Sequence, residues 1–281
     1  MKNQNGFTLV EVMIASVIGM FLVAGIINLF ITTNKSITLN DAVSQNQETG
    51  RFAMEYLTRF IRAAGYTDDF TAPIPYLMLP YTSERITINC NGVQAEACAM
   101  DNPGQRGDRL SIPFVANAEI ETRSCTGTIV GGPANGRQLL SNVFWVSEDN
   151  DTDRELRCRT FDLLNNEWLD NAVSIINNVE TMEFQIGVVP ADQRSRKSAA
   201  SYISLSSTDE SSLPFIRSMR VSILTTSIDT EEENKLKTNV ETRVYGILDA
   251  PHISITDGHL RNIFSSTVEL VNAIETASEN L

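Results

Sequence analysis

Apolar residues are concentrated in one unbroken stretch near the start of the chain. Between Phe7 and Ile31 the only charged residue is Glu11, and most of the others are large apolar residues. As an α-helix this stretch would extend about 37 Å at roughly 1.5 Å per residue, which is enough to cross a hydrocarbon core of about 30 Å. The pattern predicts a membrane-spanning helix over residues 7–31, preceded by a polar leader at residues 1–6.

Neither a secretory signal peptide nor a simple signal anchor explains this segment. A signal peptide has a shorter apolar region, of about 7–15 residues, followed by a small-x-small cleavage site that is missing here. An anchor explains Lys2 on the cytoplasmic side, but not Glu11, which would cost about 2.5–3.5 kcal/mol at mid-bilayer and less near the end of the helix. A cut between Gly6 and Phe7 would free an amine four residues before Glu11. That amine could neutralise the carboxylate in its own chain or in a neighbour.

A helical periodicity resumes after a polar stretch. The apolar residues fall at spacings of one and three: Phe52, Ala53, Tyr56, Leu57, Phe60, Ile61 and Ala64. Charged residues take the opposite side: Arg51, Glu55, Arg59 and Arg62. This pattern predicts an amphipathic continuation of the helix over residues 32–65, ending at Gly65, with its apolar face on a sheet. Asn34 and Gly50 are the weak points of this single helix, and the absence of proline before Pro73 favours a straight one.

The remaining residues, 66–281, have the pattern of a strand-rich head. Short runs of β-branched and aromatic residues alternate with turn signals. The predicted strands cover residues 84–90, 108–116, 119–125, 142–149, 155–162, 182–189, 218–228 and 241–248. Residues 192–202 and 206–212 are predicted as polar loops, and 229–239 as an exposed hairpin tip between strands. Residues 260–274 fit either a helix or a strand. The fold class is therefore α+β, a long N-terminal helix packed on a mostly antiparallel sheet.

The net charge and the absence of known catalytic motifs limit the classes of function to be considered. The net charge of −13 and pI near 4.6 disfavour direct binding of nucleic acid. The basic residues Arg194, Arg196 and Lys197 are interpreted as a solvated loop, and His252 and His259 as surface residues. The chain contains no P-loop, nucleophile elbow, zinc-protease motif or dinucleotide fingerprint. We therefore expect neither an enzyme nor a cofactor.

Two loop motifs can be interpreted either as ligand-binding sites or as structural turns. Asp149, Asp151 and Asp153 alternate as calcium ligands do, but Arg154 and Thr160 stand where a calcium-binding EF-hand loop needs glycine and glutamate. A solvated loop is favoured over a calcium site. The triplet at residues 106–108 is Arg-Gly-Asp, for which a tight turn is favoured over receptor recognition.

Four cysteines, Cys90, Cys98, Cys125 and Cys158, lack the spacing of a zinc site. If the head lies outside the cytoplasm, two disulfides are expected, and three pairings are open. We favour Cys90–Cys98 as a local link and Cys125–Cys158 as a bridge between strands.

The sequence GFTLVE at residues 6–11, followed by the apolar run, resembles the type III signal of type IV pilins and pseudopilins. The resemblance implies that a prepilin peptidase cleaves between Gly6 and Phe7 and methylates Phe7. The blocks at residues 177–188, 218–227 and 260–272 resemble the C-terminal blocks of PilW-type minor pilins, in which the last block is a strand. The surroundings of Cys125 and Cys158 also resemble that family's cysteine positions, which supports their pairing.

The resemblance implies a minor pilin that primes type IV pilus assembly and sits at or near the pilus tip. The implied partners are other minor pilins, the major pilin, the prepilin peptidase, the inner-membrane platform, the assembly ATPase and a tip adhesin. The helix would span the inner membrane with the head in the periplasm. Two alternatives stay open: a J-type pseudopilin of a type II secretion system, whose heads are usually shorter, and a membrane-anchored periplasmic adhesin or enzyme.

Overall fold

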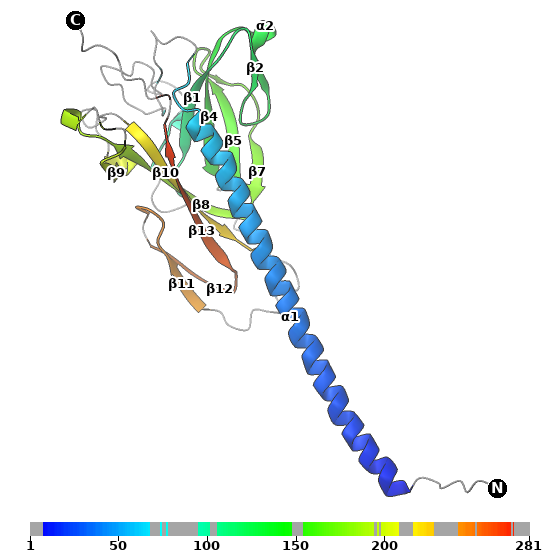
Figure 1. The fold of residues 1–281 in the computed structure, drawn as a ribbon. Coiled ribbons are helices and arrows are strands. Elements are labelled where there is room, and N and C mark those ends of the chain that lie inside the picture. Colours follow the sequence, from blue (N-terminus) through cyan, green and yellow to red (C-terminus); the bar gives the residue numbers. More distant parts are fainter. Residues whose placement is uncertain are drawn as a thin grey trace, which may run out of the picture.

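A computed structural model shows one long helix, α1, projecting from a β-rich head (Figure 1). It describes residues 8–67, 74, 77, 95–101, 106–147, 154–193, 196, 198–207, 216–227, 241–250, 252–270 and 272. The helix α1 covers Leu9–Arg62, 54 residues, without a break. Its apolar N-terminal half stands clear of the head, and its C-terminal half lies along it (Figure 1).

The ends of α1 follow from local chemistry. Thr8 is the N-cap, and its hydroxyl oxygen accepts a hydrogen bond from the backbone N–H of Glu11 at 3.3 Å. Arg59 and Arg62 lie in the last turn, where positive charge is favourable. Gly65 follows with a φ of 73°, a conformation that glycine adopts without strain. The helix passes through Asn34 and Gly50, where the sequence suggested an interruption.

The buried face of α1 reaches further toward the membrane than predicted. Ala53, Leu57, Ile61 and Ala64 of the predicted apolar face are buried, whereas Phe52 is exposed. The buried positions continue backward at helical spacing: Ala42, Asn46, Gly50, Ala53, Met54, Leu57 and Ile61. Since Asn46 and Gly50 are not apolar, the hydrophobic pattern alone did not include them.

The first sheet has the strand order β1-β4-β5-β6, with β7 also paired to β5. Its strands are β1 (Leu110–Ala116), β4 (Gln138–Val146), β5 (Glu155–Asp162), β6 (Glu167–Trp168) and β7 (Val173–Asn177). Pro113 lies in β1, an edge strand, where the missing N–H of a proline is tolerated.

The second sheet has the order β13-β10-β8-β9. Its strands are β8 (Val179–Val188), β9 (Ser201–Ile203), β10 (Ile216–Thr226) and β13 (Arg261–Glu269). Two hairpins complete the strands, β2 (Glu121–Arg123) with β3 (Ile129–Gly131), and β11 (Glu241–Tyr245) with β12 (Ile253–Asp257). The short helices are η1 (Ala95–Ala97), α2 (Gly132–Asn135), η2 (Ala191–Gln193) and η3 (Leu205–Ser207).

One core joins the helix to both sheets. Leu57 and Ile61 of α1 belong to the same buried cluster as Phe144 of the first sheet and Phe184 and Val221 of the second. All the strand pairings within the described sheets are antiparallel. The predicted α+β class, a long helix packed on an antiparallel head, is confirmed.

Several strand predictions needed correction. The predicted strand 155–162 has the bounds of β5, but β4 begins at Gln138, four residues before the predicted start. Of the described strands on either side of the predicted hairpin tip, β10 pairs with β8 and β13, and β11 pairs with β12. Residues 261–269 of the ambiguous segment form strand β13 rather than a helix. The predicted loop 192–202 contains the start of β9, while the tract 229–239 itself and the predicted strand 84–90 lie outside the described residues.

Candidate functional site

The apolar half of α1 is an uncovered hydrophobic surface. This part of the helix is long and apolar enough to cross a membrane, and the described part of the head does not bury it. The exposed side chains are Leu9, Val10, Val12, Met13, Ile14, Val17, Ile18, Met20, Phe21, Leu22, Val23, Ile26, Ile27, Leu29, Phe30 and Ile31. They surround the helix on every side. Such a helix is stable only in lipid or against other apolar helices.

Glu11 lies in the first turn of this surface. A carboxylate is favourable there because the first helical N–H groups carry partial positive charge. Its described partner is Thr8, whose hydroxyl lies 3.4 Å from Glu11 Oε2. Gly6 and Phe7, the predicted cleavage and methylation positions, lie outside the described residues.

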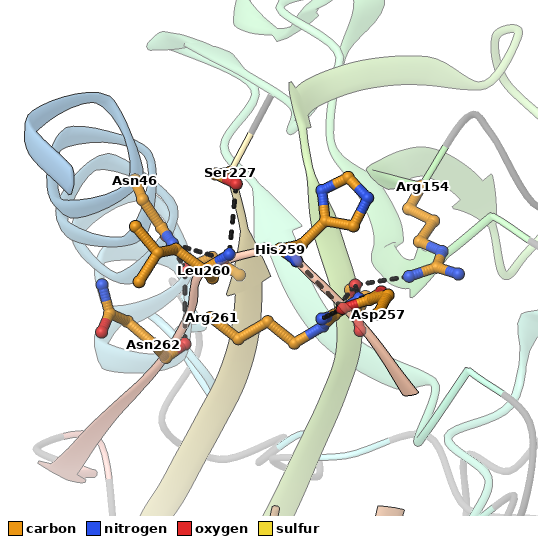
Figure 2. A network of polar contacts seen from close by, with 10 residues as sticks. Asn46, Arg154, Ser227, Asp257, His259, Leu260, Arg261 and Asn262 are labelled. Atoms are coloured by element: carbon orange, nitrogen blue, oxygen red, sulfur yellow. Dashed lines mark hydrogen bonds and ion pairs between the residues drawn. The ribbon is translucent and has the colours of Figure 1, made fainter. Parts of the chain in front are cut away.

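The head holds α1 through a buried asparagine that the sequence analysis missed. Asn46 is 1% exposed, and its side-chain N–H donates to the carbonyl of Leu260 at 3.2 Å. Its amide oxygen accepts from the hydroxyl of Thr225. Figure 2 shows Asn46 pointing from the helix into the end of the sheet, where Leu260 also pairs with Ser227. Asn46 thus fixes the position of the helix relative to β10 and β13, and extending the helical spacing backward from Ala53 would have located it.

A buried arginine joins the sheet to the neighbouring hairpin at the same end. The Arg261 side chain is 2% exposed and donates to both oxygens of Asp257, at 2.6 and 2.7 Å (Figure 2). It also donates to Glu180 of β8 at 2.8 Å, and Arg154 pairs with the same glutamate. Burial alone would raise the pKa of Asp257, but the hydrogen bonds and charge of Arg261 hold it below its usual range. These four charges connect β8, β12, β13 and the entry to β5.

The disulfide lies beneath the last turns of α1. Cys125 and Cys158 are joined, with their Cα atoms 6.2 Å apart, and this is the pairing that we favoured. The Tyr56 hydroxyl donates to the carbonyl of Cys125. Phe60 packs on Phe144 with ring centroids 5.4 Å apart. Cys98 is also disulfide-bonded, while Cys90 lies outside the described residues.

The Arg-Gly-Asp triplet is built into the head. Asp108 is 3% exposed, and its carboxylate accepts from the backbone N–H of Phe184 at 2.9 Å. Gly107 has a φ of 82°, and a β-carbon there would overlap the backbone of Met182. Burial, together with the charge and hydrogen bond of Asp108, raises the pKa of neighbouring Glu183 to about 9. The triplet is therefore a structural turn whose aspartate is not available to a receptor.

The other sequence candidates have no assembled site in the described part of the chain. Residues 148–153, with the three aspartates considered for calcium, lie outside it, as do Arg194 and Lys197. No group of metal-binding side chains occurs among the described residues. His252 is exposed as predicted, but His259 is half-buried, and its backbone N–H donates to Asp257 at 3.0 Å.

The fold and the uncovered helix define a class, a membrane-anchored protein with a β-rich head after one N-terminal helix. Two family models match this chain. One is the prokaryotic N-terminal methylation motif, at residues 1–27, and the other is the type IV pilus-assembly protein W, at residues 143–272. Together the two matches support a type IV pilus minor pilin of the PilW family. Pilins are structural proteins.

Comparison with curated protein sequences finds no match. Among solved structures, the chain is similar to a type IV-like pilin from Thermus thermophilus. The identity is 15% and the TM-score 0.38, over 84% of this chain and 96% of that one.

Proposed function

We propose that this minor pilin primes type IV pilus assembly and is incorporated at or near the pilus tip. The observation that supports the proposal is the uncovered apolar half of α1, attached to a head that holds the rest of the helix through Asn46 and a shared core. A subunit of this shape can leave lipid only if other apolar helices replace the lipid around α1. Other minor pilins and the major pilin provide such helices, and the assembly ATPase and inner-membrane platform supply the work.

The proposal includes processing of the leader. Prepilin peptidase would cleave between Gly6 and Phe7 and methylate Phe7, placing the new amine four residues before Glu11. The match to the methylation motif supports this step. Intact-mass measurement of protein recovered from membranes tests it. We expect a chain that lacks residues 1–6, carries one methyl group and contains two disulfides, whereas an uncut chain would contradict the step.

Priming and location need an experiment in cells. In a strain without this protein we expect few or no surface pili, restored by the wild-type gene. Gold-labelled antibody against the head should mark filament ends rather than their length. Normal pilus number in the deletion strain, or labelling along the whole filament, would contradict the proposed role. Loss of secretion through a type II system, with pili unchanged, would support the pseudopilin alternative.

A further inference from the structure

Both tryptophans of the chain lie in one surface pocket of the first sheet. The pocket has a volume of about 300 Å³ and is lined by Glu96, Arg109, Trp145, Ser147, Arg157, Arg159, Trp168 and Ala172. Arg157 and Arg159 alternate with buried Leu156 and Cys158 along β5, so both arginines lie on the outer face of the sheet. Trp145 is the cross-strand partner of Arg157. A chain with a net charge of −13 thus gathers three arginines and its two tryptophans at one place.

The two β5 arginines are held in position by one nitrogen each. Nε of Arg157 donates to Glu155 at 3.0 Å, and Nε of Arg159 donates to the carbonyl of Asp170 at 2.7 Å. Among the described residues, the terminal nitrogens of Arg157 and Arg159 make no hydrogen bond. The Arg159 guanidinium stacks 4.4 Å from the centroid of Trp168, and the Trp168 and Phe161 rings lie nearly perpendicular with their centroids 5.0 Å apart. The pocket therefore presents guanidinium groups whose orientation is already set.

These groups select a ligand by two kinds of contact. A guanidinium with two available N–H groups binds a carboxylate through paired hydrogen bonds. A tryptophan face packs on the C–H groups of a sugar ring, and a pocket of this size encloses a ligand of one or two rings. We propose that this pocket binds an acidic sugar, such as a hexuronate unit of a polysaccharide.

Single-stranded nucleic acid fits the same pocket less well. Its binding sites combine stacking with a basic groove that follows the backbone over several nucleotides. Here Glu96 lines the pocket and Glu155 pairs with Arg157, so the positive charge is local rather than extended. The proposal concerns the head alone and does not depend on the assembly role proposed above.

Fluorescence of the two tryptophans tests the proposal, because both report on this pocket. Full-length protein in detergent would be titrated with trigalacturonate and with its methyl ester, which has the same rings without the charge. We expect a saturable change with the acid, with a Kd below about 1 mM. The ester should bind at least about tenfold more weakly. A calorimetric titration of the same pair covers the case in which binding leaves the fluorescence unchanged.

Two variants separate the pocket from general charge. Arg157→Gln should weaken trigalacturonate binding at least about tenfold, whereas Arg243→Gln, at an exposed position on β11, should leave it unchanged. Unfolding midpoints of both variants would establish that the heads are intact. Equal binding of acid and ester, no binding by either method, or equal loss in both variants would overturn the proposal. Tighter binding of oligothymidylate that Arg157→Gln abolishes would also overturn it, in favour of nucleic acid.

Discussion

At the scale of single residues, Gly50 shows how a position that weakens a helix can be required by packing. Glycine costs about 1 kcal/mol relative to alanine inside a helix. The ring of Phe264 on β13 occupies the space in which a β-carbon of residue 50 would lie. The missing side chain lets α1 approach β13 at this point. The close packing of α1 on β13 at this point therefore outweighs the lower helix propensity of glycine.

Gly50→Ala should therefore destabilise the head despite the better helix propensity of alanine. Overpacking typically costs about 1–3 kcal/mol, which exceeds the gain in propensity unless the Phe264 ring moves. Urea unfolding of the full chain in detergent, followed by fluorescence of Trp145 and Trp168, measures the change. Gly25→Ala is the matched control, because nothing lies within 4 Å of a β-carbon there. A midpoint for Gly50→Ala at or above that of the wild type would contradict the packing argument, and Phe264→Leu should partly rescue the variant.

Glu183 makes a second residue-scale prediction, on pH dependence. Its pKa, raised to about 9 by burial and by Asp108, lies well above the ordinary value of 4.5. Between these values the folded chain keeps a proton that the unfolded chain has lost, so stability falls as pH rises. Glu183→Gln retains the shape without the ionisation. The difference in unfolding midpoint between variant and wild type should therefore grow in favour of the variant from pH 5 to pH 9. A constant difference across this range would show that Glu183 does not titrate as proposed.

At the scale of elements, the charges around Arg261 hold the β11–β12 hairpin and β13 to β8. Arg261 is buried between Asp257 and Glu180, so its removal leaves the half-buried Asp257 without its arginine and the buried Glu180 with Arg154 alone. Breaking a buried pair in this way typically costs about 3–5 kcal/mol. We expect Arg261→Met to lower stability by this order, measured by urea unfolding. Arg243→Met, at an exposed site, is the control.

A double variant distinguishes pairing from packing at the same place. In Arg261→Met with Glu180→Met, both members of the ion pair are replaced by apolar side chains of similar length. The double variant should lose less stability than the sum of the two single variants. Each single variant leaves one charge of the pair buried without its partner, whereas the double variant removes both charges. Additive losses would mean that Arg261 contributes through packing of its side chain and not through the ion pair.

The elements also show what the sequence could and could not predict. Strand β5 was predicted with its bounds because its sequence is a short run with apolar residues between turn signals, and the structure buries Leu156 and Cys158 of that run. Strands β7 and β12 were missed because each is only five residues long and no residue in either strand is fully buried. Asn46 was read as part of a polar stretch, since its partners Thr225 and Leu260 are 179 and 214 residues away. Local patterns thus predict periodic elements, whereas polar contacts between distant segments appear only after folding.

At the scale of the whole molecule, α1 is one rod with two environments. Its C-terminal half is fixed by Asn46, Gly50 and the core, while its N-terminal half is not buried by the described part of the head. Because the helix is continuous, the head and the N-terminal half would move together in the proposed transfer from the membrane to a filament. Packing of the apolar halves would then set the position of the head, and Glu11 lies within that apolar half.

Glu11→Ala should leave cleavage largely intact but impair incorporation into filaments. The variant lacks a charge that costs about 2.5–3.5 kcal/mol at mid-bilayer, and less near the helix end, so it should insert in the membrane at least as well as the wild type. It also loses the carboxylate proposed to pair with the Phe7 amine in its own chain or in a neighbour, which leaves that amine unpaired among apolar side chains. The ratio of protein in sheared pili to protein in membranes, by immunoblot, measures incorporation, and intact mass of the membrane fraction measures cleavage.

Glu55→Ala, which removes an exposed carboxylate from the other half of α1, is the control. Equal incorporation of Glu11→Ala and wild type would mean that apolar packing alone selects this subunit. A simultaneous loss of cleavage would instead place the role of Glu11 at the peptidase.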